Sequence, residues 1–136
     1  LSHAIGVAVA RGDGRVVLFD GDGSLLMYIQ ELETIRRHDV KLLIVCSNDG
    51  AYGAEIHKLR ADGLSDRNAV FGRPDFESIA SGFGLRGATV TTPGQLAALL
   101  SDYEAHDSAE IWNVHISDQV ISPSMRRSIE AGHGVR

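Results

Sequence analysis

The stretch DGDGSLLMYIQELETIRRHDVKLLIVCSNDG, residues 20–50, alternates between two kinds of hydrophobic pattern. It follows the apolar run RVVLF (15–19), which predicts a strand buried on both faces. Apolar residues at helical spacing then predict a helix over 24–37, and KLLIVCSND (41–49) predicts a second buried strand. A strand, a helix and another strand in this order predict an α/β fold with a parallel sheet. The apolar residues of the helix are Leu25, Tyr28, Ile29, Leu32 and Ile35.

The rest of the chain continues this alternation. Residues 1–10 read as the end of a packed helix, 55–60 as a short helix and 74–84 as a further helix that begins at a Pro-Asp pair. The runs ATVTT (88–92) and AEIWNVHIS (109–117) predict two more strands. We therefore expect a three-layer, doubly wound, mostly parallel sheet with helices on both faces.

Two segments remain around these elements. Thr92, Pro93 and Gln95 have the pattern of a helix start with a capping box. The 60–74 segment reads as a loop, and the 118–136 tail shows little clear pattern. The helix after Thr92 is expected to bury Leu96, Leu99, Leu100 and Tyr103.

Composition bounds the class of protein. The chain has 136 residues, a size typical of one domain, with 43% apolar and 23% charged residues. Its net charge of −5 lacks the basic footprint of a nucleic-acid binder, and its apolar runs fall far short of the ~20 residues that span a bilayer. The lone Cys46 is expected to fill the core, and no secretory signal is visible, so we expect a cytoplasmic location. Because Leu1 lies inside an apparent helix, we expect the chain to be a C-terminal fragment of a longer enzyme.

Glycines and acids follow two neighbouring predicted strands. FDGDGS (19–24) ends the first strand and SNDGAYG (47–53) ends the second. In open parallel sheets, ligands bind at the carboxyl ends of the strands. Glycines let the backbone approach a ligand closely, and a helix that begins near Ser24 offers free N–H groups to a phosphate or diphosphate.

A dinucleotide fold is the first interpretation of this pattern. Gly21 and Gly23 supply G-x-G, but the third glycine of the fingerprint is replaced by Leu26. Asp22 also argues against it, because two unit charges at ~4 Å repel by about 4 kcal/mol at an effective dielectric constant of 20. A divalent cation reverses that sign, and Asp22 and Asp49 are oxygen ligands suited to Mg²⁺.

The stretch GDGSLLMYIQELETIRRHDVKLLIVCSNDGAYG (21–53) resembles the diphosphate-binding motif of thiamine-diphosphate enzymes of the acetolactate synthase, pyruvate decarboxylase and benzoylformate decarboxylase family. The resemblance extends over nearly the whole chain. It implies metal coordination by Asp22, Asp49 and the backbone carbonyl of Ala51. The family has Asn where this chain has Asp49, and Asp retains an oxygen ligand. The resemblance assigns thiamine diphosphate binding to Gly21, Asp22, Gly23, Ser24, Asp49, Ala51, Tyr52 and Gly53.

Glu55 is the candidate catalytic residue. It stands where the pyruvate decarboxylase branch of the resembled family carries a catalytic Glu, whereas acetolactate synthases have an apolar residue there. An exposed helix Glu is an equally good interpretation. His57 could contact substrate, but a surface position is the better interpretation.

The resemblance implies a thiamine-diphosphate- and Mg²⁺-dependent 2-oxo acid decarboxylase or carboligase, of which this chain is the diphosphate-binding domain, inactive alone. The implied partners are a 2-oxo acid substrate and a pyrimidine-binding domain of the same or a neighbouring chain, in a homodimer or homotetramer, with no nucleic acid or membrane. Two alternatives stay open. The chain could be one subunit of a split two-chain decarboxylase, or a non-catalytic structural or regulatory module that retains the fold.

Overall fold

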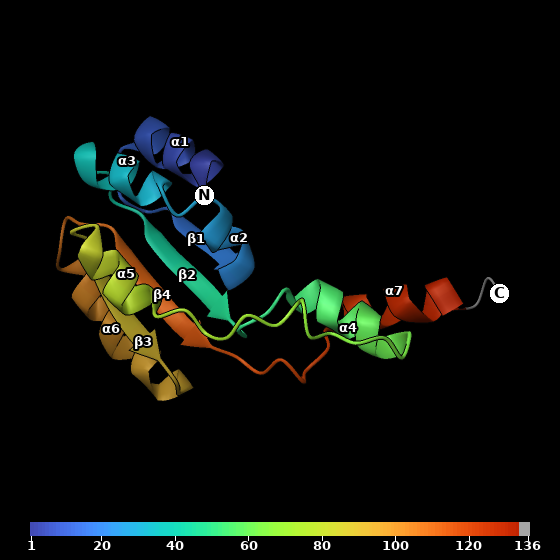
Figure 1. Cartoon of the computed structure of the whole chain (residues 1–136). Helices are drawn as coiled ribbons and strands as arrows, with labels where there is room; N and C mark the ends of the chain where they lie inside the picture. The colour runs from blue at the N-terminus through green and yellow to red at the C-terminus, as the bar shows by residue number, and fades with distance from the viewer. Residues whose placement is uncertain (134–136) are drawn as a thin grey trace.

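Four parallel strands form the centre of the molecule (Figure 1). The structure is a computed structural model that describes residues 1–133. The strands lie in the order β1-β2-β4-β3, and each of the three pairings is parallel. This confirms the predicted α/β class. The strands are β1 (Val17–Gly21), β2 (Leu43–Asn48), β3 (Arg86–Val90) and β4 (Glu110–His115).

Helices cover both faces of the sheet, which gives the predicted three layers. The helices α1, α2, α3 and α5 contribute to the core on one face, which contains Ile44. The helix α6 packs on the other face, against Leu43 and Trp112. Leu43 and Ile44 are successive residues of β2 and point to opposite faces of the sheet. The helices are α1 (Ser2–Arg11), α2 (Asp22–Met27), α3 (Glu31–Arg37), α4 (Gly53–Ala61), α5 (Phe76–Gly82), the short 3₁₀ helix η1 (Pro93–Gln95), α6 (Leu96–Glu104) and α7 (Pro123–His133).

The continuous apolar run of β1 had predicted a strand buried on both faces. In the structure, one face of β1 is exposed. Val17 is 46% exposed and Phe19 is 75% exposed. The reason is its position, because β1 is at the edge of the described sheet and α6 packs instead against β2 and β4. A hollow of about 470 Å³, lined by Val17, Phe19 and other apolar side chains, remains on this face.

The helix α6 buries less than expected. The predicted capping box between Thr92 and Gln95 is present. Tyr103 is buried and Leu99 packs partly against the sheet. Leu96 and Leu100, however, are 38% and 45% exposed because they line the hollow beside β1. The expectation that all four residues are buried was therefore wrong.

The single helix expected over 24–37 is two helices. The helix α2 begins at Asp22, two residues earlier than expected, and a turn separates it from α3. In this turn the Glu31 amide donates to the Tyr28 carbonyl at 2.9 Å and the Leu32 amide to the Ile29 carbonyl at 3.2 Å. These bonds span three residues rather than four, so the chain tightens while its apolar spacing persists. Tyr28 is 47% exposed, contrary to its predicted place on the buried face.

The tail contains a helix, α7, which sequence patterning did not predict. Figure 1 shows α7 beside α4, beyond the carboxyl ends of β2 and β4. Arg60 of α4 joins this region together: Nε donates to Asp66 at 2.7 Å, and Nη1 donates to the Asp118 carbonyl at 2.8 Å. The carboxyl end of the sheet is therefore flanked by a unit formed from α4 and the chain leading into α7.

Candidate functional site

Asp22 lies at the carboxyl edge of the sheet, where β1 passes into α2. Its side chain is buried, and the residue is only 2% exposed. Oδ1 accepts a hydrogen bond from the Gly23 amide at 2.8 Å, and Oδ2 accepts one from the Gly50 amide at 2.7 Å. The second bond joins the two glycine-containing segments that the sequence had placed together.

The environment of Asp22 is unfavourable for an isolated negative charge. Burial raises the pKa of Asp22, the hydrogen bonds from Gly50 and Gly23 partly offset this effect, and the charge of Asp49 raises it further. A carboxylate in such a place gains most from a nearby cation. Each of its oxygens retains a second lone pair for that purpose.

Asp49 follows β2 directly. Its Oδ1 accepts a hydrogen bond from the Ala51 amide at 3.1 Å. Its Oδ2 lies against the start of α4, where a Cβ atom on Gly53 would stand 2.5 Å from it. A side chain at position 53 would therefore force the Asp49 carboxylate to move from this place.

The backbone of residues 49–52, the 49–52 loop, is held on its other side by residues 69–73, the 69–73 segment. Ala51 forms an antiparallel bridge with Val70. The hydrogen bonds of this bridge are made by the residues on either side of Ala51 and Val70. The Tyr52 amide donates to the Ala69 carbonyl at 2.8 Å, and the Phe71 amide donates to the Gly50 carbonyl at 3.0 Å. Within the described residues the Ala51 carbonyl accepts no backbone hydrogen bond of this kind, so it is available as an oxygen ligand.

An aromatic pair borders Asp22. The rings of Tyr52 and Phe71 meet edge to face, with centroids 5.1 Å apart. A Cβ atom on Gly23 would lie 2.8 Å from the Tyr52 ring. A larger residue at position 23 would therefore displace the Tyr52 ring from its place over the backbone next to Asp22.

The remaining predicted residues have less specific surroundings. Gly21 precedes α2 in an extended conformation, and Ser24 is half-buried in the first turn of α2. Glu55 lies in the first turn of α4, exposed, with its carboxylate 3.4 Å from Lys58 Nζ. His57 is half-buried on the same helix. Their proposed roles stay predictions.

Two other acidic or nucleophilic groups near Asp22 have local explanations. Asp20 Oδ1 accepts a hydrogen bond from the adjacent Gly21 amide at 2.9 Å. Cys46 is fully buried, and burial, with the charges of Asp22 and Asp20, raises its pKa to about 12. Its thiol is therefore a core group, as expected, and not a nucleophile.

The donor set around Asp22 fits a hard divalent cation. Within residues 1–133, no three side chains among His, Cys, Asp and Glu are grouped so that they could hold a metal ion. A cation here would depend on the carboxylates of Asp22 and Asp49, the Ala51 carbonyl and oxygens of a ligand. That combination suits Mg²⁺, which binds through few protein carboxylates together with phosphate oxygens.

Sequence reasoning missed the residues that support this loop from outside the motif. Phe71 and Arg73 lie in the segment predicted only as a loop, and Asn113 lies in the middle of a predicted strand. Arg73 Nε donates to the Asn48 carbonyl at 3.3 Å, and Arg73 Nη2 donates to the Ile116 carbonyl at 2.6 Å. No local pattern marks such contacts, because they connect residues distant in sequence.

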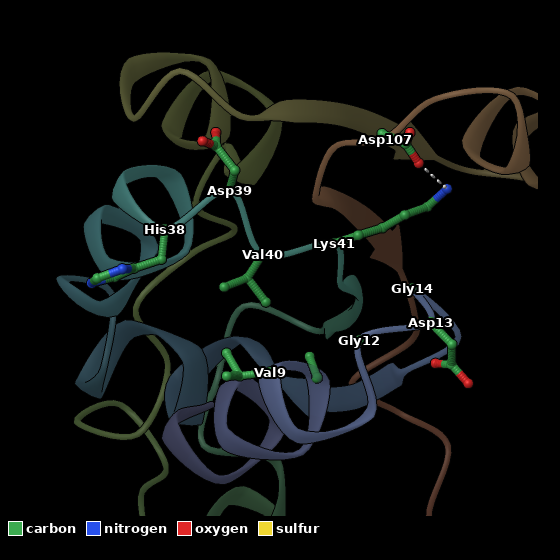
Figure 2. Close-up of a pocket in the computed structure, with 10 residues that line it drawn as sticks. Val9, Gly12, Asp13, Gly14, His38, Asp39, Val40, Lys41 and Asp107 are labelled. Atoms are coloured by element: carbon green, nitrogen blue, oxygen red, sulfur yellow. Dashed lines mark ion pairs between the residues drawn. The ribbon is translucent and has the colours of Figure 1, made fainter.

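A hollow of about 430 Å³ lies at the opposite end of the sheet, before the strands begin (Figure 2). It is lined by the 12–14 turn, residues 38–41 and Asp107, and none of the predicted site residues reaches it. Figure 2 shows Lys41 extending toward Asp107, with Nζ 3.6 Å from the carboxylate. The other two carboxylates that line it, Asp13 and Asp39, pair with Arg11 and Arg36, so the carboxyl edge with Asp22 remains the candidate site.

The structure defines an α/β domain in which the Asp22–Gly50 contact joins two strand ends, and comparison with known proteins specifies its family. Residues 1–112 match the family described as thiamine pyrophosphate enzyme, C-terminal TPP binding domain, and the chain belongs to this family. No helix within residues 1–133 has the length and apolar character needed to cross a membrane.

Relatives in this family are similar over most of the chain. The large subunit of acetolactate synthase from Haemophilus influenzae is 33% identical over 101 residues, which cover 73% of this chain and 18% of that protein. The isozyme 2 large subunit from Escherichia coli is 32% identical over 120 residues, which cover 87% of this chain and 22% of that protein. The chain thus spans about a fifth of the length of these relatives.

A solved structure supports the same fold. The thiamine diphosphate-dependent 4-hydroxybenzoylformate decarboxylase of Rhodococcus jostii RHA1 superposes with a TM-score of 0.73 and 25% identity, over 86% of this chain and 22% of that chain.

Proposed function

We propose that this chain is the diphosphate-binding domain of a thiamine-diphosphate- and Mg²⁺-dependent 2-oxo acid decarboxylase or carboligase related to acetolactate synthase. The single observation that carries the proposal is the 2.7 Å hydrogen bond from the Gly50 amide to Asp22 Oδ2. It unites the G-D-G turn with the 49–52 loop, the two halves of one oxygen-rich site.

In this proposal Asp22, Asp49 and the Ala51 carbonyl hold Mg²⁺, and the cation holds the diphosphate. Gly21, Gly23 and Ser24 bring backbone close to the phosphates, while Tyr52 and Gly53 border the same site. When bound, the cofactor would supply a nucleophilic carbon for addition to a 2-oxo acid and a cationic ring that can accept the electron pair released with CO₂. The protein residues would orient the cofactor, and the Mg²⁺ held by the two carboxylates would neutralise part of its phosphate charge.

Glu55 is proposed as the group that exchanges a proton with the reacting substrate through its carboxylate. Its place in the first turn of α4, directly after the 49–52 loop, supports this role. Lys58 competes for the same carboxylate at 3.4 Å. This pair is exposed, and exposed ion pairs contribute little free energy, so the Glu55 side chain can leave Lys58 and reorient.

The proposed enzyme also needs a pyrimidine-binding domain, from the same or a neighbouring chain, so this domain alone would be inactive. The chain matches only about a fifth of the length of its relatives, which supports the need for a further domain. A homodimeric or homotetrameric assembly and a cytoplasmic location are further predictions of the sequence.

The test is calorimetric titration of thiamine diphosphate into the full-length protein, with and without Mg²⁺. Binding should require Mg²⁺ and should be lost in Asp22→Ala. Asp20→Ala is the matched control: within residues 1–133 the Asp20 carboxylate bonds only to the adjacent Gly21 amide, and the variant protein should bind normally. Binding that ignores Mg²⁺, or that survives Asp22→Ala unchanged, would refute the proposal and favour the non-catalytic alternative.

A further inference from the structure

Two buried asparagines face each other at the carboxyl edge of the sheet. Asn48 is the last residue of β2, and Asn113 lies on β4, the strand next to it (Figure 1). They are 0% and 2% exposed. Asn48 Nδ2 donates to Asn113 Oδ1 at 2.8 Å and to the Pro74 carbonyl at 2.9 Å. The Asn48 side chain is therefore fixed by two partners distant in sequence.

This pair breaks the pattern of the surrounding core. On the same face of the sheet, β2 contributes Ile44 and Cys46 and β4 contributes Ile111, all in the hydrophobic core. Burying two amides costs free energy unless they are hydrogen-bonded, and Asn48 Oδ1 accepts no hydrogen bond within the described residues. Core packing alone would be served better by apolar side chains here.

The position of Asn48 gives the pair a different use. Asn48 directly precedes Asp49 and Gly50, so its orientation determines the direction in which the chain leaves β2. Its carbonyl also accepts hydrogen bonds from the Ile116 amide at 3.0 Å and from Arg73 Nε at 3.3 Å. Side chain and backbone of Asn48 are thus both held, immediately before the 49–52 loop.

We propose that Asn113 is a positioning residue for the Asp22–Asp49 site, acting through Asn48 to fix the 49–52 loop. The expected effect of Asn113 on cofactor binding rests on the proposed function. Its expected effect on the 49–52 loop does not. Asn113 touches neither Asp22 nor Asp49 in any hydrogen bond of the described residues. Its own Nδ2 lies 3.5 Å from Thr89 Oγ1, which places it between β2 and β3. Residues that hydrogen-bond directly to metal ligands typically alter metal affinity about 10- to 100-fold when replaced, and Asn113 acts one residue further out, through Asn48 beside Asp49.

The first experiment measures amide hydrogen exchange in the cofactor-free, full-length protein. Asn113→Ala should accelerate exchange at the Gly50 and Tyr52 amides about tenfold or more, because these amides bond to Asp22 and to the Ala69 carbonyl only while the loop is fixed. Asn113→Asp keeps an oxygen acceptor for Asn48 Nδ2 and should restore slow exchange. Trp112→Phe is the matched control. Trp112 lies on the same strand as Asn113 but on the opposite face of the sheet, and the variant loses the 3.1 Å hydrogen bond from Trp112 to Glu110. Its exchange rates at these two amides should be unchanged relative to the rest of the sheet.

The second experiment measures Mg²⁺-dependent binding of thiamine diphosphate by the same variants. Asn113→Ala should bind about 10- to 100-fold more weakly, Asn113→Asp within a fewfold of the parent, and Trp112→Phe like the parent even where its melting temperature falls. Equal exchange and equal affinity in Asn113→Ala and the parent would overturn the inference, as would losses that follow melting temperature in all variants. A parent protein that binds no cofactor would instead refute the proposed function, while the exchange experiment still decides the role of Asn113.

Discussion

The Gly50 amide donates a 2.7 Å hydrogen bond to Asp22 Oδ2, and this bond connects the ends of two neighbouring parallel strands. Gly50 has a φ of +78°, a conformation that glycine adopts without strain. A Cβ atom there would also lie 2.9 Å from the Gly72 backbone. Gly50 therefore serves two contacts at once: its amide faces Asp22, and its other side packs against the 69–73 segment.

The first prediction concerns pH. Because burial raises the pKa of Asp22, protonation is more favourable in the folded protein than in the unfolded chain. Without cofactor, Asp22 therefore adds to the free energy of unfolding at any pH below about 3.9, its pKa in the unfolded chain. This contribution is lost as the pH rises through the higher pKa of Asp22 in the folded protein. Mg²⁺ must displace the proton, so its affinity should fall about tenfold for each pH unit below the raised pKa.

Calorimetry of Mg²⁺ and thiamine diphosphate binding across a pH series checks this. Proton release on binding should grow as the pH falls toward the pKa of Asp22. Binding that stays constant down to the ordinary range of an aspartate would contradict it.

The second prediction concerns Gly53. In Gly53→Ala the new Cβ atom would stand 2.5 Å from Asp49 Oδ2, so the carboxylate must move. We expect Mg²⁺-dependent cofactor binding to weaken about tenfold, the equivalent of ~1.4 kcal/mol. Gly82→Ala is the control, because nothing lies within 4 Å of its Cβ position at the end of α5. Parallel titrations of both variants check this, and a Gly53→Ala protein that binds like Gly82→Ala would refute it.

The third prediction concerns Asp49, where the resembled family has Asn. Asp49→Asn keeps an oxygen to accept the 3.1 Å hydrogen bond from the Ala51 amide but removes one negative charge. Affinity for Mg²⁺ alone should fall by about tenfold, because cation affinity depends on ligand charge. With thiamine diphosphate present the difference should shrink, since the variant also repels the phosphates less. Competition titrations with and without cofactor measure both values. An unchanged affinity for Mg²⁺ alone would count against Asp49 as a ligand, and equal losses in both titrations would count against the phosphate-repulsion argument.

The fourth prediction concerns Glu55 as a proton-exchanging group. Glu55→Gln should lower kcat of the full-length enzyme on 2-oxo acids by about 100-fold, the usual scale of acid–base catalysis, and leave cofactor affinity unchanged. Lys58→Gln frees the Glu55 carboxylate from its 3.4 Å partner without removing it and should retain activity. Steady-state turnover of pyruvate and larger 2-oxo acids measures both variants. If Glu55→Gln turns over at the parent rate, Glu55 is a surface residue.

The parallel sheet could be predicted from the sequence because its strands are short, strongly apolar runs separated by helical patterns. The same runs could not distinguish an edge strand from a central one, so Phe19 was wrongly expected to be buried. The break between α2 and α3 was also invisible, because the tightened turn at Tyr28 keeps Leu25 and Leu32 on the buried face.

The site was predictable as far as its local motifs extend. Asp22 and Asp49 were expected to lie near each other because parallel strands end at one edge, and the amide of Gly50, the residue after Asp49, bonds to Asp22. The supporting contacts from Phe71, Arg73 and Asn113 could not be derived, because each depends on how distant segments pack and none repeats with a period in the chain.

The 49–52 loop described above is bonded to residue 22 on one side and to residues 69–71 on the other. Both connections join parts of the chain that are far apart in sequence. Closing such long loops is slow, since the entropy of ordering is lost before the contacts form. We therefore expect the site to mature late in folding, after the strands have paired, so that a newly made chain would acquire most of its secondary structure before it could bind any ligand at Asp22.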